Sequence, residues 1–294
     1  MNENNEFDKK QSRRDRVRKA LKTMFSRKIV VIAAIGLLLF ILIAVFAPVL
    51  TPYDPNVTSP YEALQKPSKA HWLGTDDFGR DTLTRLMYGA RVSLIVGVLA
   101  VFVAAIIGVF LGLCASYFGG VVDAVIMRLG EALMSIPTIM VSMALIVIIG
   151  NTIPDLAIIL AIPTIPGYIR MIRGQALSLK NSDYVKNAEL QGGKSLYIML
   201  RHILPNAFSP IIVMMTQQVG QSILMESGLS YVGIGISIPI ASWGTMVSNG
   251  KNYLITNPLL AIVPGICIAL LVICLNILGD GLRDALDPRV RGEI

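Results

Sequence analysis

The stretch YVKNAELQGGKSLYIMLRHILP, residues 184–205, decides how the rest of this 294-residue chain is interpreted. It is polar and net basic, and it lies between long apolar runs on both sides. Helix-forming residues come first, Gly192 and Gly193 interrupt them, and a second helical run from Ser195 to Ile203 ends before Pro205. This pattern predicts two short helices around a glycine break, forming a compact knob that projects from a membrane.

The composition is typical of an all-α membrane protein. Hydrophobic residues make up 54% of the chain and charged residues only 15%, which excludes an ordinary soluble domain. About 20 residues, each rising 1.5 Å, cross a bilayer as a helix. We therefore expect six spans, with a basic tail at 1–28 and a long polar loop at 51–91. The spans lie at 29–50, 92–118, 132–154, 156–169, 203–225 and 252–279.

The fourth predicted span is short and interrupted by Pro163 and Pro166. We count it as a kinked crossing because it separates turns poor in basic residues from the strongly basic stretch at 180–205. With this count, 20 of the 26 Lys and Arg residues fall on the side of the two termini and 6 on the other. The positive-inside rule then predicts that both termini are cytoplasmic and that loop 51–91 is extracellular. The basic tail is a membrane flank on this view, and no nucleic-acid partner is expected.

One motif in the knob suggests nucleotide binding and is rejected. Gly193, Lys194 and Ser195 match the end of a P-loop, but Ala188 stands where the first glycine is required. Polar residues also precede it where the motif needs a buried strand. We expect no ATPase site in this chain.

The acidic and histidine residues do not indicate a metal or catalytic site. Asp76, Asp77 and Asp81 lie close together, but the spacing of an EF-hand is absent. His71 and His202 are isolated from each other and from any catalytic cluster. The sequence therefore predicts no catalytic residue, no bound cofactor and no metal in this chain.

Polar side chains form a stripe on the fifth predicted span. Gln217, Gln218, Gln221 and Ser222 pair at a spacing of four residues and so face protein or water rather than lipid. Two interpretations stay open: hydrogen bonds between helices, or the lining of a transport pathway. Glu226 follows the stripe, and we expect it to lie at the membrane boundary, as we expect for Asp155.

The knob stretch resembles the EAA loop found in the membrane subunits of ABC importers. Residues Ala188, Gly192, Ile198, His202, Leu204 and Pro205 match that pattern, whereas Lys186 and Asn187 replace the usual Glu and Ala. Further segments resemble the oligopeptide, dipeptide and nickel permeases of this class. They are LGTDDFGRD at 73–81, GLSYVGIG at 228–235, SWG at 242–244 and GDGLRDALDPR at 279–289.

The resemblance implies a type I ABC importer permease whose loop at 180–205 forms a coupling helix seated on an ATPase subunit. The residues implied in coupling are Lys186, Ala188, Glu189, Gly192, Ile198, His202 and Pro205. It also implies a place in the cell membrane among lipids, with three kinds of protein partner in one assembly. The partners are a homologous second permease, two ATPase subunits that bind the ATP, and an extracellular substrate-binding protein.

The function implied is import of di- or oligopeptides. A nickel or metal-chelate importer shares the same motifs and remains the alternative within the class. A secondary transporter is the alternative from a different class, and it needs buried charges or an ion site in the spans, which here are nearly free of charge. A membrane enzyme lacks its catalytic constellation.

Overall fold

The computed structural model describes residues 21–237 and 239–286. In this part of the chain the structure is helical, with one isolated β-bridge between Thr75 and Asp81. The long helices are α2 Lys28–Leu50, α3 Thr82–Phe118, α4 Gly120–Met134, α5 Thr138–Ile149, α6 Ile153–Ala161, α7 Ile165–Lys180, α10 Phe208–Val232 and α12 Leu259–Leu286. The shorter ones are α8 Asp183–Leu190, α9 Ser195–Ile198 and α11 Trp243–Gly250, with single turns η1 Pro60–Glu62, η2 Ile162–Thr164 and η4 Lys251–Tyr253 and a π-helical turn η3 Met199–Ile203.

The predicted all-α membrane architecture is confirmed. Helices α2, α3 and α12, and the continuous run 153–180 through α6 and α7, are long and apolar enough to cross a membrane. Two bent pairs also qualify when each is taken as one span: α4 with α5, bent by 93°, and residues 195–203 with α10, bent by 74°. The described residues thus contain four spans, or up to six with the bent pairs included.

Several boundaries differ from those expected. Helix α3 begins at Thr82 inside the predicted loop, because the Asp81 carboxylate accepts hydrogen bonds from the backbone N and the hydroxyl of Thr84, both at 2.7 Å. The stretch between the second and third expected spans is mostly helix α4, and α4 meets α5 at a 93° bend where Pro137 stands. Pro163 and Pro166 do not interrupt the fourth span, since each occupies the first turn of a new helical segment, where proline is tolerated.

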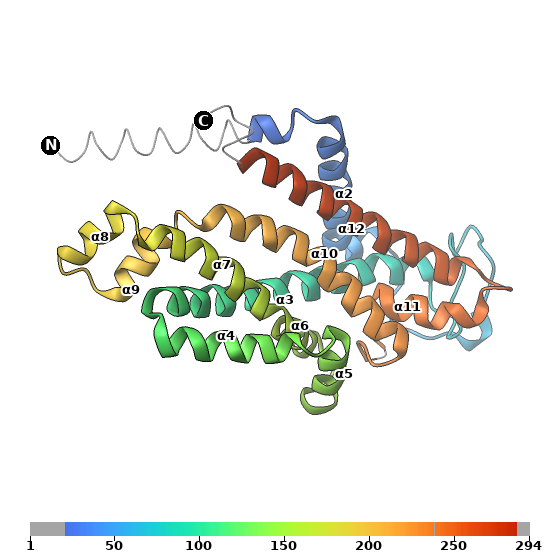
Figure 1. The fold of residues 1–294 in the computed structure, drawn as a ribbon. Coiled ribbons are helices and arrows are strands. Elements are labelled where there is room, and N and C mark those ends of the chain that lie inside the picture. Colours follow the sequence, from blue (N-terminus) through green and yellow to red (C-terminus); the bar gives the residue numbers. More distant parts are fainter. Residues whose placement is uncertain (1–20, 238, 287–294) are drawn as a thin grey trace.

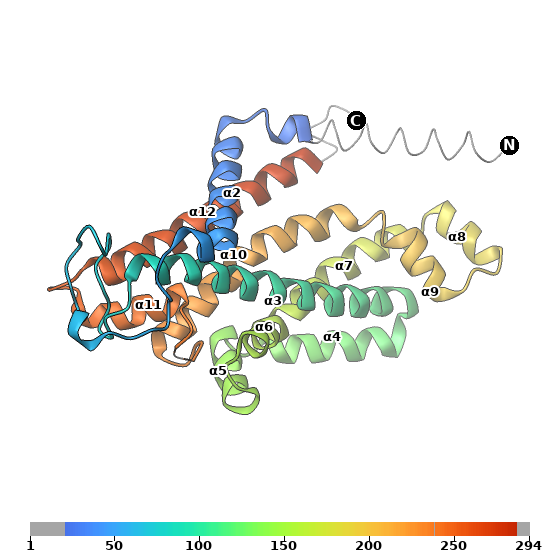
Figure 2. The same cartoon turned by 180° about the vertical axis from the view of Figure 1, so that it is seen from behind.

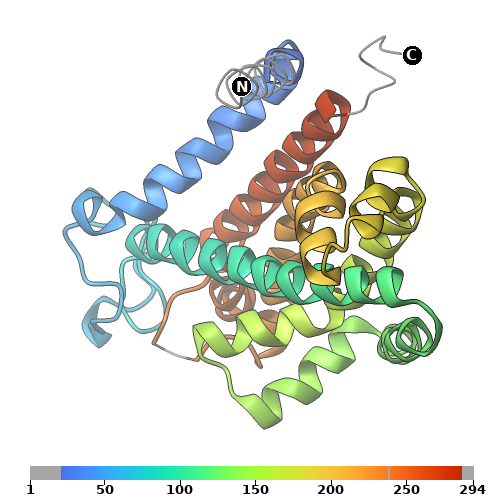
Figure 3. The ribbon, with the colours of Figure 1, turned by 90° about the vertical axis from the view of Figure 1, so that its left-hand side faces the viewer.

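Helix α3 is the longest of the described helices, and α2, α4, α6, α7 and α10 pack against it (Figures 1 and 2). Its tightest contact is with α7: a Cβ atom added at Gly112 would lie 2.0 Å from Cγ2 of Ile172 and 2.7 Å from the carbonyl oxygen of Ile169. The two backbones approach this closely only because Gly112 has no side chain. Helices α2 and α12 lean together on one side of the bundle, as the view along its length shows (Figure 3).

Two ends of the bundle carry the segments outside the long helices. Helices α8 and α9 project from one end, which we call the knob end, and residues 183–203 are called the knob (Figure 1). Loop 51–81 and helix α11 lie at the opposite end, called the loop end (Figure 1). An apolar groove runs between α2, α3 and α10 and is open to the surroundings.

Candidate coupling and pathway sites

The knob has the form expected from its sequence. Helix α8 ends at Leu190, and Gly192 then adopts a φ of +76°, in the left-handed region that side chains disfavour. The amide of Gly192 donates to the carbonyl of Glu189 at 2.9 Å, which closes the turn before α9 begins at Ser195. The second run continues through η3 to Ile203 and turns sharply into α10. The expected glycine break between the two short helices is confirmed.

The base of the knob is anchored in the bundle by apolar side chains. Val185, Ile198 and Ile203 are fully buried, and Met199 is nearly so. They form one core cluster with residues from α3, α7 and the start of α10. Those residues are Leu113, Ile172, Ala176, Ala207 and Ile211. Burial on this scale, at roughly 25 cal/mol per Å² of apolar surface, holds the knob in a fixed orientation on the bundle.

The outer surface of the knob exposes both apolar and charged groups. Leu190 is 86% exposed, and Leu196 and Tyr197 are more than half exposed. Of the predicted coupling residues, Lys186, Glu189, Gly192 and Pro205 lie on the surface, Ala188 and His202 are half-buried, and Ile198 is in the core. The His202 ring packs edge-on against Tyr197, with centroids 5.5 Å apart. Lys186 forms no ion pair within the described residues.

The polar stripe on α10 divides between two environments. The Gln217 amide donates to Asp280 of α12 at 3.0 Å, and Ser222 is only 3% exposed, so these two face protein. Gln221 is exposed, and Gln218 is half-buried. Neither amide has a hydrogen-bond partner in the described residues. Gln217 thus makes a contact between helices, whereas the lining of a pathway stays a prediction for Gln218 and Gln221.

Glu226 corrects one expectation. The sequence predicts a position at the membrane boundary, but the side chain is fully buried within the bundle. Its carboxylate accepts hydrogen bonds from the hydroxyl of Ser230 at 2.9 Å and from that of Ser93 on α3 at 3.3 Å, and Ser242 at the start of α11 also faces it. A buried carboxylate needs such donors. Glu226 thus joins α10 to α3 and α11.

Asp155, in contrast, is half-buried and closes a capping box with Thr152 at the start of α6.

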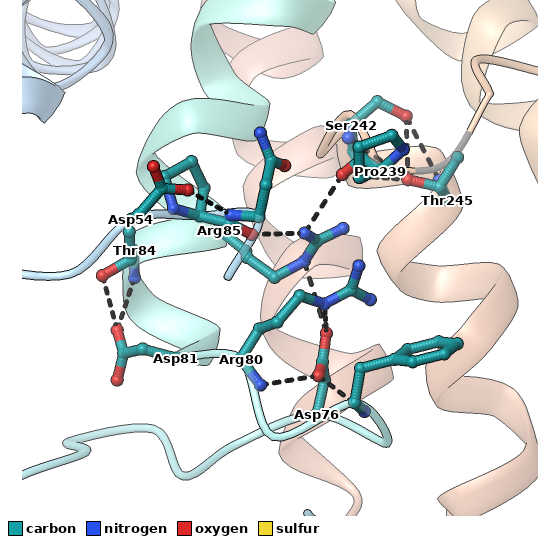
Figure 4. Close-up of polar contacts among 12 residues, drawn as sticks. Asp54, Asp76, Arg80, Asp81, Thr84, Arg85, Pro239, Ser242 and Thr245 are labelled. Atoms are coloured by element: carbon teal, nitrogen blue, oxygen red, sulfur yellow. Dashed lines mark hydrogen bonds and ion pairs between the residues drawn. The ribbon is translucent and has the colours of Figure 1, made fainter. Parts of the chain in front are cut away.

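The loop end contains a polar cluster that sequence reasoning did not identify as a unit (Figure 4). The Asp76 carboxylate accepts from Arg80 Nε at 2.7 Å and lies 3.4 Å from Arg85 Nε. Arg85 is 3% exposed and also donates to the carbonyls of Pro55 at 2.6 Å and Pro239 at 3.3 Å. It therefore fastens the first helical turn of α3 to two loops far apart in sequence. Its nearness to three aspartates in the sequence was the available signal.

Two of the three aspartates near this cluster, Asp76 and Asp81, are occupied by protein partners. Asp76 pairs with two arginines, and Asp81 contacts His71 Nδ1 at 2.9 Å besides capping α3. Within the described residues no group of three or more His, Cys, Asp and Glu side chains is placed to hold a metal ion.

Comparison with known proteins agrees with this geometry. Residues 104–292 match the family model described as binding-protein-dependent transport system inner membrane component, and residues 16–67 match the N-terminal TM domain of oligopeptide transport permease C. The chain belongs to this family of ABC importer permeases. The methionine ABC transporter MetNI, solved in inward-facing conformations, shares the fold, with a TM-score of 0.56 and 17% identity over 70% of this chain and 98% of that chain.

Sequence relatives of this permease cover nearly its whole length. It is 40% identical to the dipeptide transport system permease protein DppC of Alkalihalophilus pseudofirmus, over 93% of this chain and 90% of that protein. It is 39% identical to the glutathione transport system permease protein GsiD of Pectobacterium atrosepticum, over 91% and 89%. It is 38% identical to the probable D,D-dipeptide transport system permease protein DdpC of Escherichia coli K12, over 90% and 88%.

Family membership makes the chain a membrane transport subunit of the multi-pass permease type. In this permease the predicted coupling residues lie on the projecting knob, apart from Pro205, which follows it by two residues. The predicted pathway residues are split between buried and exposed positions. The loop-end cluster around Arg85 lies at the far end of α3 from the knob.

Proposed function

We propose that this chain is the permease subunit of an ATP-driven importer of di- or oligopeptides, and that its knob end faces the cytoplasm. The observation that carries the proposal is the knob, which is anchored by a buried apolar base and exposes Leu190, Leu196 and Tyr197 at its surface. A rigidly mounted apolar surface of this kind is suited to docking in a cleft of a partner protein.

Peptides are the substrates that the relatives support. The three relatives carry dipeptide, glutathione or D,D-dipeptide in their names, and glutathione is itself a short peptide. We propose that Gln221 and Gln218 line the pathway, because their free amides lie on a membrane-spanning helix and can both donate to and accept from a peptide backbone.

The remaining subunits follow from the proposal. Two ATPase subunits bind the ATP, a homologous second permease completes the pathway, and an extracellular binding protein delivers the substrate. Lys186 is exposed on α8, and we propose that the ATPase presents a carboxylate opposite it, since a desolvated ammonium needs such a partner. The chain itself supplies no ATPase site.

Reconstitution tests the function. The complete transporter is placed in lipid vesicles, the binding protein is added outside, and uptake of labelled dipeptide, tripeptide and nickel is measured with and without ATP. ATP-dependent peptide uptake is expected, and the purified chain alone should hydrolyse no ATP. Uptake of nickel without uptake of any peptide would overturn the substrate assignment, and ATP hydrolysis by the chain alone would revive the P-loop interpretation.

A further inference from the structure

Helix α7 connects the knob to the rest of the bundle. It runs from Ile165 to Lys180 and leads within a few residues into α8, so α7 is one of the two helices that continue from the knob into the bundle, the other being α10. Besides its apolar packing, α7 makes two polar contacts with its neighbours near the knob end, and both use a basic residue of α7.

The first contact is a two-point ion pair between α7 and α4. Arg173 Nε donates to Asp123 Oδ1 at 2.5 Å, and a terminal guanidinium nitrogen donates to Oδ2 at 2.6 Å. The side chains are only 31% and 22% exposed. Paired parallel hydrogen bonds of this kind fix the relative orientation of the two groups as well as attracting them.

The second contact joins the end of α7 to the end of α3. The Lys180 ammonium donates to the carbonyl of Tyr117 at 2.5 Å and reaches that of Ser116 at 3.5 Å. These carbonyls belong to the last turn of α3, where helical partners are lacking and a positive charge is favourable. The ammonium also lies 5.4 Å from the centre of the Tyr117 ring.

The ion pair is especially important for α4. Helix α3 already adheres to α7 through the close contacts at Gly108 and Gly112, but α4 has no buried residue of its own. Without a strong polar contact, α4 has little that would make it follow α7. The Arg173–Asp123 pair supplies that contact one turn after α4 begins.

We propose that the contacts of Arg173 with Asp123, and of Lys180 with the end of α3, are the mechanical links that pass knob movement to α3 and α4 during transport. The proposal rests on the proposed importer function. Arg173, Asp123 and Lys180 are positioning residues, because they are argued to act through the helices they join. Breaking them should leave ATP hydrolysis running while fewer peptides are moved per ATP.

A matched control lies on α4, the helix that carries Asp123. Arg128 and Glu131 of α4 also form an ion pair, at 3.3 Å, but both belong to α4 and their side chains are 84% and 47% exposed. An exposed pair within one helix contributes little and joins no second element. Arg128→Gln therefore removes a charge and an ion pair from α4 without breaking a link to α7.

The experiment measures peptides imported per ATP hydrolysed by the complete transporter in vesicles. Asp123→Asn, Arg173→Gln and Lys180→Gln should each lower this ratio by about fivefold or more, the lower end for a coupling between two sites. ATPase activity and the amount of assembled complex should be kept. The exchanged pair Asp123→Arg with Arg173→Asp should recover part of the ratio, and Arg128→Gln should match the wild type.

Two results would overturn the proposal: a wild-type ratio in Asp123→Asn, or transport and hydrolysis falling in proportion in every assembled variant. If Asp123→Asn fails to assemble, Arg173→Lys decides, because it keeps the charge and loses the two-point geometry; a wild-type ratio there also rejects the link. Failure of the importer function itself is recognised separately, since the wild-type transporter would then import no peptide at all.

Discussion

At the scale of single residues, Asp77 is an unusual carboxylate. Its Oδ1 atom is buried without a hydrogen-bond partner in the described residues, and it lines a small cavity with Thr82, Asn249 and Tyr253. Burial, reinforced by the neighbouring charge of Asp76, raises the pKa of Asp77 above its ordinary value of 3.8, although nearby arginines oppose the shift. The folded state therefore binds this proton more tightly than the unfolded state does.

This shift has a definite sign in stability. Because the folded pKa is raised, the stability contributed by the group is fully present below pH 3.8 and is lost as the pH rises through the folded pKa. Asp77→Asn should therefore raise the melting temperature of the detergent-purified protein at neutral pH and lose that advantage in acid. Asp54→Asn, at an exposed position of the same loop, is the control. Parallel pH profiles for wild type and Asp77→Asn would contradict this account.

The buried carboxylate of Glu226 leads to a second prediction, which concerns the stability of the bundle. Glu226→Ala would leave the hydroxyls of Ser93 and Ser230 without their acceptor and open a void between α10 and α3. We expect a loss of about 2 kcal/mol or more in the free energy of unfolding, measured by denaturant titration in detergent. Glu226→Gln keeps an acceptor and should cost less. Equal stability of the Ala variant and the wild type would remove Glu226 from the structural core.

At the scale of elements, the α3–α7 contact depends on Gly112. Gly112→Val would force the two helices apart, because its Cβ would stand 2.0 Å from the Ile172 side chain and 2.7 Å from backbone. A clear fall in melting temperature is expected, typical of overpacking by about 1–3 kcal/mol. Gly174→Ala on α7 is the control, since nothing lies within 4 Å of the added atom. A helix gains from alanine at such a position, so this variant should melt no lower than the wild type.

Elements differ in how far the sequence alone predicts them. The knob is predictable because the glycines within it and Pro205 just after it are local signals. The long apolar runs are predictable because their length matches a bilayer. The start of α3 at Thr82 is not predictable from the sequence, since it depends on the Asp81 carboxylate, inside a polar stretch, accepting a hydrogen bond from the Thr84 amide. The sequence does not predict the burial of Glu226 either, because two of its serine partners belong to α3 and to the start of α11, which are distant in sequence. Arg173 and Asp123 lie 50 residues apart, and only the fold brings them together.

At the scale of the whole molecule, the two ends of the bundle differ in shape and charge. The knob end carries the basic stretch at 180–205. Loop 51–81 lies at the opposite end, where Arg80 of the loop and Arg85 of α3 are buried and pair with Asp76. The positive-inside rule places the more basic side in the cytoplasm, because free Lys and Arg resist translocation. An ATPase partner docking on the knob requires the same orientation, so one test of sidedness bears on both arguments.

Cysteine labelling measures that orientation. Cys114, Cys267 and Cys274 are first replaced by serine or alanine, and single cysteines are then introduced as Ser68→Cys in the loop and Asn181→Cys beside the knob, both at exposed positions. In intact cells a membrane-impermeant maleimide should label residue 68 and leave residue 181 unlabelled. In inverted membrane vesicles the pattern should reverse, which shows that residue 181 is reactive when reached. Labelling of residue 181 in sealed cells would place the knob outside, where no ATPase could meet it.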